Sequence, residues 1–184
     1  MEVFPVDKLF KKNAMGNNIF HEIAIQGSLM LLQTIRDNVD GQMDTYLSEI
    51  NDQNESCITI VADRHRGLLA KDLIEIFVDL GADINETDNW GNTALHYSVF
   101  HRDHVLAEWL CQQPGINLNA INNDEHTPLG LAILWNIQSI KTLLESKGAR
   151  FNNIEFSDSE TSDDDDDDDD DGHDENDEPM RTRG

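Results

Sequence analysis

The feature that most constrains this chain is an internal repeat with a period of 34 residues. Residues 81–89 (GADINETDN) align with residues 115–123 (GINLNAINN), and residues 93–96 (TALH) align with residues 127–130 (TPLG) at the same offset. Looser copies of the second motif begin at Ser56 and Asn18. A unit of this length cannot bury a hydrophobic face alone, so neighbouring units must stack.

The period and the motif are typical of ankyrin repeats, which are near 33 residues long and carry Thr-Pro-Leu-His. We therefore predict an all-α ankyrin-repeat solenoid of about four repeats, over residues 18–55, 56–92, 93–126 and 127–154. Residues 1–17 are interpreted as an N-terminal cap or leader. The Asn- and Asp-rich stretches 83–92 and 117–125 predict turn-forming fingers between the repeats.

Local sequence signals agree with this organisation. Ser or Thr at the start of the first helix in the later repeats can cap a free backbone N–H, and Pro128 falls at the first helical position. His96 is predicted to tie its turn to a neighbouring backbone. The second helices have these apolar residues at helical spacing: Leu69, Leu73, Ile76, Phe77 and Leu80; Val105, Leu106, Trp109 and Leu110; Ile137, Ile140, Leu143 and Leu144.

The first repeat carries an insertion over residues 36–55. Its apolar residues Met43, Tyr46, Leu47 and Ile50 fall at helical spacing and predict an extra amphipathic helix.

Charge is distributed unevenly along the chain. The net charge is −24, and residues 155–184 contribute 16 acidic side chains against two Arg. This segment has only two apolar residues, Phe156 and Met180, so we expect a disordered acidic tail. Ser157, Ser159, Thr161 and Ser162 lie among the acids and are candidate sites for acidophilic kinases.

Composition excludes several classes of protein. The acidic balance disfavours direct binding to nucleic acid and favours a basic protein partner. The apolar runs are too short for a membrane span, and no secretory signal is visible. Two cysteines make no disulfide framework. The sequence has no phosphate loop, nucleophile elbow or metal-ligand spacing, so we expect no enzyme, no metal and no cofactor.

Candidate partner-binding residues lie on the fingers and at the ends of the first helices. Trp90 at a finger tip could anchor a partner or pack on the next finger, and Trp135 could contact a partner or the neighbouring repeat. The full set is Asp88, Asn89, Trp90 and Asn92; Phe100, His101 and Arg102; Asn122, Asn123 and Asp124; and Trp135 and Asn136.

The order and spacing of these motifs resemble the inhibitor-of-kappa-B family over residues 18–154. With its short length and about four repeats, the chain resembles the viral ankyrin proteins of polydnaviruses. The resemblance implies a monomer that binds host Rel/NF-kappa-B proteins in the host cytoplasm, or also in the nucleus, and blocks their DNA binding. Residues 1–27 contain no Ser or Thr, so the phosphorylated degron of the cellular inhibitors is absent and we expect a non-degradable inhibitor.

Two other functions stay open at this point. The chain could be a generic ankyrin scaffold for another protein partner. It could also be an acidic-tail binder of histones or other basic proteins, in which case the tail alone would suffice for binding.

Overall fold

The computed structural model describes residues 11–38 and 43–151. The chain divides into two units, residues 1–154 and residues 155–184, and all the described residues belong to the first. The described residues form helices and loops without any strand, which confirms the all-α prediction. None of these helices is long and apolar enough to cross a membrane.

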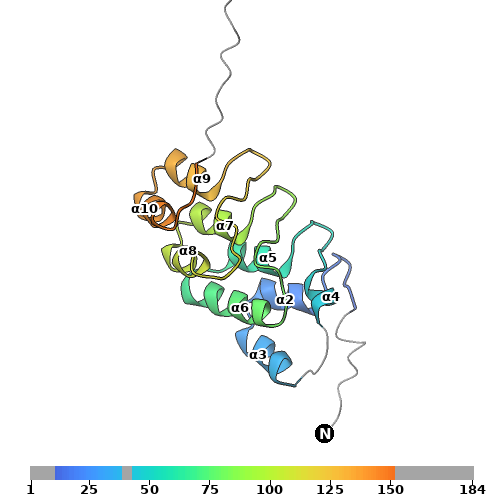
Figure 1. The fold of residues 1–184 in the computed structure, drawn as a ribbon. Helices are drawn as coiled ribbons and strands as arrows, with labels where there is room; N and C mark the ends of the chain where they lie inside the picture. Colours follow the sequence, from blue (N-terminus) through green and yellow to red (C-terminus); the bar gives the residue numbers. More distant parts are fainter. Residues whose placement is uncertain (1–10, 39–42, 152–184) are drawn as a thin grey trace, which may run out of the picture. The chain divides into compact units, whose positions relative to one another are not determined.

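The helices of the described residues form four consecutive pairs (Figure 1). The pairs are α2 (Ile19–Gln26) with α3 (Leu29–Asn38), α5 (Cys57–Arg64) with α6 (Gly67–Asp79), α7 (Ala94–Phe100) with α8 (His104–Leu110), and α9 (Pro128–Leu134) with α10 (Gln138–Ser146). The first helices pack in the order α2, α5, α7, α9, and the second helices in the order α3, α6, α8, α10. The result is the two-layered stack that the repeat predicted, with the connecting loops on one side (Figure 1).

Capping residues begin the first helices where the sequence predicted them. The Ser56 side chain accepts the Thr59 N–H at 3.2 Å, and the Thr127 hydroxyl accepts the Gly130 N–H at 3.1 Å. In the first repeat Asn18 takes this role and accepts the His21 N–H at 3.2 Å. Each cap satisfies a backbone donor that the helix leaves unpaired, and so it determines where the helix starts.

One continuous core joins the repeats. Phe20 of α2 and Phe77 of α6 meet edge to face with ring centroids 6.1 Å apart, and both are fully buried. The apolar faces of the second helices are narrower than the sequence predicted, because Leu69 and Val105 are exposed. Both lie near the start of their helix.

The insertion forms one helical turn rather than a longer helix. This turn is α4 (Asp44–Leu47), beside the buried side chains of Met43 and Leu47. The predicted helix does not extend to Ile50, whose side chain is 47% exposed. A tight turn, described below, starts at Asn51.

Candidate partner-binding surface

Four tight turns of identical hydrogen bonding form the tips of the fingers, at residues 13–18, 51–56, 88–93 and 122–127. We call them the first to fourth fingertips. Each begins with an Asn or Asp whose Oδ1 accepts the backbone N–H groups two and four residues later, at 2.8 to 3.2 Å. Each ends at the residue that caps the next helix.

The first and second fingertips were not predicted from the sequence. The first fingertip lies mainly within the segment that we interpreted as a cap or leader, and the second lies at the end of the predicted insertion. Asn13 and Asn51, each five residues before a helix cap, were the available signal.

Three of the candidate binding residues are buried inside the fingertips. They are Asp88, Asn92 and Asn122, none of which is more than 7% exposed. Asp88 accepts the N–H groups of Trp90 and Asn92, while the side-chain amide of Asn122 donates to Asn92 Oδ1 at 2.9 Å. Because these groups are occupied inside the fingers, their side chains support the surface rather than form it.

The remaining candidates on these fingertips face solvent. Trp90 is 58% exposed, and Asn89, Asn123 and Asp124 are also exposed. The fourth fingertip supports the third through backbone, because the Asn123 N–H donates to the Trp90 carbonyl at 2.8 Å. The Trp90 side chain therefore projects from a held backbone, as an aromatic anchor requires.

The ends of α7 and α9 carry a row of aromatic rings. Phe100 and Trp135 lie with ring centroids 5.0 Å apart, and Trp135 remains 41% exposed. Trp135 therefore packs on the preceding repeat, which is one of the two roles that the sequence left open, and contact of its exposed face with a partner stays a prediction. His101 is partly exposed and contacts Asp63 Oδ1 through Nε2 at 3.1 Å.

Arg102 follows the end of α7 and Asn136 follows the end of α9. Both residues are exposed and have left-handed backbone conformations, with φ of 54° each. Such a conformation is uncommon outside glycine, and it turns the chain sharply from the first helix of a repeat toward the second.

Tyr97 connects the third fingertip to the aromatic row, and sequence reasoning did not single it out. Its hydroxyl donates to Asp88 Oδ2 at 2.5 Å, and its ring stacks on His101 and meets Phe100 edge to face. Burial, with Asp88 as a further contribution, raises the pKa of Tyr97 far above its ordinary value, so the hydroxyl keeps its proton and its hydrogen bond. The fingertip and the helix ends therefore form one connected surface.

His96 has the structural role that the sequence predicted. Its fully buried ring lies within 2.9 Å of the Thr93 hydroxyl through Nδ1 and within 3.1 Å of the His126 carbonyl through Nε2. His21 repeats the arrangement with the Glu55 carbonyl at 3.2 Å. Burial lowers the pKa of both histidines, so both rings are neutral at pH 7.

Both cysteines of the described residues are buried. Burial raises the pKa of the Cys111 thiol to about 11 and that of Cys57 well above its ordinary value, so neither is a ready nucleophile. Within residues 11–38 and 43–151, no group of His, Cys, Asp and Glu side chains could hold a metal ion. The candidate phosphorylation sites Ser157, Ser159, Thr161 and Ser162 and the acidic tail lie outside the described residues.

Comparisons with known proteins agree with this architecture. A family model for ankyrin repeats in three copies matches residues 59–155. I-kappa-B like protein N2 of Microplitis demolitor bracovirus is 34% identical over 151 residues, which is 80% of this chain and 82% of that protein. I-Kappa-B like protein N1 of the same virus is 38% identical over 108 residues, covering 58% of this chain and 78% of the relative. I-Kappa-B like protein C1 is 37% identical over 132 residues, covering 68% and 72%.

Proposed function

The chain belongs to the I-kappa-B-like ankyrin-repeat proteins of bracoviruses, and from this we propose that it binds host Rel/NF-kappa-B proteins and keeps them from DNA. The single observation that carries the proposal is the pair of exposed aromatic side chains, Trp90 and Trp135, which are joined through Asp88 and the partly buried Tyr97 and Phe100. Exposed aromatic side chains on a held backbone are typical anchors of protein interfaces. The function is that of an inhibitor without catalysis.

Charge complements these anchors. The chain carries a net charge of −24, whereas a surface that contacts DNA is basic. An acidic ankyrin stack therefore attracts the DNA-contacting face of a transcription factor and repels the DNA that competes for it.

The inhibitor is proposed to act constitutively. Residues 1–27 contain no Ser or Thr, so this segment offers no hydroxyl whose phosphorylation could trigger release. We propose the host cytoplasm as the main place of action, with access to the nucleus possible for a chain of 20.9 kDa.

The test is a pull-down of insect Rel proteins with the full chain, combined with a kappa-B DNA shift assay on the same samples, before and after immune stimulation. The proposal expects stable capture with loss of the DNA shift, unchanged by stimulation. The absence of any captured Rel protein would refute it.

Two variants test the surface within the same assay. Trp90→Ala and Trp135→Ala should each weaken capture on the order of tenfold, because each removes an aromatic anchor. Met30→Ala is the control, because Met30 is an exposed apolar residue of α3, outside the fingertips and the aromatic row. Equal capture by all the variants would show that Trp90 and Trp135 do not belong to the interface.

The acidic tail supports a second candidate function, the binding of histones or other basic proteins. Its 16 acidic side chains against two Arg would suffice for that role. A chain ending at Ile154 should then lose all binding, whereas a Rel inhibitor should keep binding the Rel dimer and lose mainly its ability to displace DNA.

A further inference from the structure

The junctions between neighbouring repeats can be compared residue by residue. Between the third and fourth repeats, His96 contacts the His126 carbonyl and the Asn123 N–H donates to the Trp90 carbonyl. Between the first and second repeats, His21 contacts the Glu55 carbonyl and the Asp52 N–H donates to the Met15 carbonyl at 3.1 Å. These two junctions use the same pair of contacts.

The junction between the second and third repeats has neither contact. Thr59 stands where the other two junctions have a histidine, and its short side chain bonds only within its own turn. In the described part of the chain, no hydrogen bond joins the second fingertip to the third.

A difference at the fingertip corner explains the missing backbone bond. The corner residue is left-handed in all four fingertips, and it is Gly16 in the first and Gly91 in the third, but Asn54 in the second. A Cβ at Gly91 would lie 2.8 Å from Asn123 Oδ1, so glycine lets the next fingertip approach. Asn54 has a Cβ at the equivalent place, and no backbone hydrogen bond among the described residues joins this fingertip to the third.

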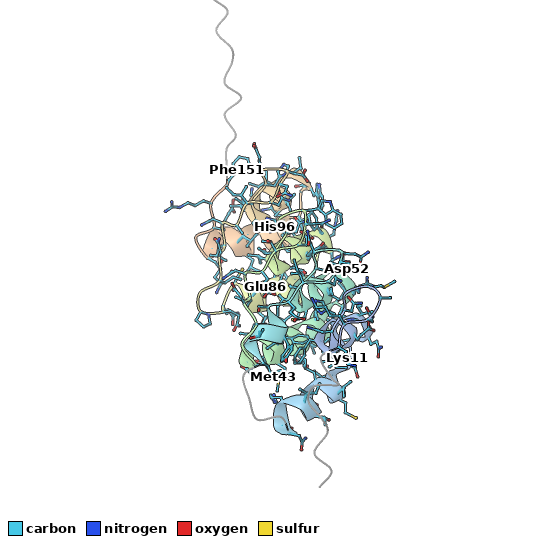
Figure 2. All side chains as sticks on the ribbon, turned by 90° about the vertical axis from the view of Figure 1, so that its right-hand side faces the viewer. Lys11, Met43, Asp52, Glu86, His96 and Phe151 are labelled. Carbon is cyan, nitrogen blue, oxygen red and sulfur yellow. The ribbon has the colours of Figure 1, made fainter. Side chains whose placement is uncertain are left out.

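The junction that has Thr59 in place of a histidine also contains Glu86. This glutamate aligns with Ala120, whose carbonyl faces His96 in the following junction. In that junction a large histidine meets a small alanine, whereas here a small threonine meets a large glutamate. The first junction also has a glutamate at this position, Glu49 beside His21, but its carboxylate forms an ion pair with Lys12 and accepts from the Asn18 side chain. Figure 2 shows Glu86 and His96 in the middle part of the stack of repeats.

The environment of Glu86 suits a neutral carboxyl better than a charged one. Its Oε2 is buried and has no hydrogen-bond partner, and no lysine or arginine of the described residues forms an ion pair with it. The groups that face it are Ser56 and Cys57 from the second repeat and Asp83 from its own loop. Desolvation raises the pKa of Glu86 to about 7, Asp83 adds to the rise, and the Ser56 hydroxyl opposes it.

We propose that Glu86 makes the third finger, residues 82–93, respond to pH near neutrality. When Glu86 is neutral, its carboxyl stays buried and the finger remains closed on the second repeat. When Glu86 ionises, the carboxylate turns toward water and the finger loosens, because neither a histidine contact nor a fingertip bond holds it there.

The direction of the effect follows from proton linkage. A carboxyl whose pKa is raised on folding stabilises the closed finger fully below the unfolded pKa, about 4.5, and this stabilisation is lost as the pH rises through about 7. Since this finger presents Trp90, the anchor of the third fingertip is held more firmly under mildly acidic conditions than at pH 8.

Hydrogen exchange of the full chain between pH 5.5 and 8, corrected for the intrinsic exchange rate, tests the proposal. Protection of residues 82–93 should fall on the order of tenfold over this range. The fourth finger, residues 116–127, carries Ala120 at the equivalent position and serves as the internal control. Its contact with His96 weakens only as the pH falls, so its protection should not decrease toward pH 8. Equal responses of the two fingers would overturn the proposal without any variant.

Variants then assign the response to Glu86. Glu86→Gln should abolish the pH dependence of the third finger, whereas Asp124→Asn, which removes an exposed fingertip carboxylate, should retain it. The double variant Thr59→His, Glu86→Ala rebuilds the pair found in the next junction and should keep the finger protected up to pH 8. A Glu86→Gln protein with the wild-type pH response would refute the proposal.

Discussion

Single side chains in this molecule hold one repeat to the next, and His96 is the clearest case. Both ring nitrogens are engaged, one within its own turn and one with the His126 carbonyl of the following fingertip. The sequence predicted this role from the position of His96 in the repeat motif. It could not predict the acceptor, because His126 lies 30 residues further along the chain.

Replacing His96 with Ala should lower the free energy of unfolding by about 2 to 4 kcal/mol, because it leaves a cavity and an unpaired buried carbonyl. Urea unfolding measures the change. His104→Ala is the matched control, since His104 is exposed on α8, and it should stay within about 0.5 kcal/mol of the parent. Equal losses in the two variants would contradict the structural role of His96.

The buried histidines also give the fold a dependence on pH. Burial lowers the pKa of His21 and His96 from 6.5, so their contribution to stability is complete above pH 6.5 and is lost as the pH falls below it. The urea midpoint should therefore fall between pH 7 and pH 5.5, and by a smaller amount in His96→Ala. Glu86 acts in the opposite direction between about pH 4.5 and 7, so the measurement is best made in the Glu86→Gln background.

At the scale of elements, the fingertips are built by one rule, and their differences decide how closely they pack. An Asn or Asp at the first position and a left-handed residue at the fourth produce the same turn four times. Whether the next turn can hydrogen-bond to it depends on the residue at the left-handed corner. Glycine permits the approach at Gly16 and Gly91, whereas Asn54 does not.

Gly91→Ala should destabilise the protein more than Gly115→Ala does. Both glycines are left-handed, with φ of 74° and 79°, so an alanine side chain strains the backbone equally at the two positions, by about 1 kcal/mol. Only at Gly91 does the new Cβ collide with the neighbouring fingertip, whereas nothing lies within 4 Å at Gly115. Thermal unfolding of the two variants isolates the cost of the collision, and equal melting temperatures would rule out close packing of the fingertips.

At the scale of the whole molecule, charge and core are separated along the sequence. The described helices and buried core lie within residues 11–151, while residues 155–184 contribute 16 acidic side chains and two Arg to a net charge of −24. We therefore expect the packing of the repeats to be independent of the charge that residues 155–184 carry.

Removing residues 155–184 should leave the free energy of unfolding within about 0.5 kcal/mol of the parent in 0.5 M salt, because the segment has almost no apolar surface to bury. At low salt the shortened chain should be equally stable or slightly more stable, since the removal reduces the repulsion between like charges. Urea unfolding at the two salt concentrations measures both effects. A large loss of stability in high salt would show that the tail packs on the repeats.

Much of the fold could be predicted from local sequence. Helix caps, turn residues and the apolar period act over a few residues, so Ser56, Thr127 and Pro128 predicted helix starts that the structure confirms. The candidate surface was harder to predict, because burial depends on neighbours from another repeat. Asp88, Asn92 and Asn122 have the polar character of surface residues, yet the fingertips enclose them.

The sequence by itself therefore determined the repeated helix pairs, their caps and the acidic balance, since each depends on residue type and on short spacing. Only the tertiary structure decided that Trp90 and Trp135 are exposed, that Tyr97 connects them through Asp88 and Phe100, and that Glu86 Oε2 is buried without a hydrogen-bond partner. Several of these contacts join neighbouring repeats, and the period places such residues in register without specifying their contacts. Stacking brings each repeat into contact with the next one. How firmly two neighbouring repeats are joined depends on the side chains that meet between them.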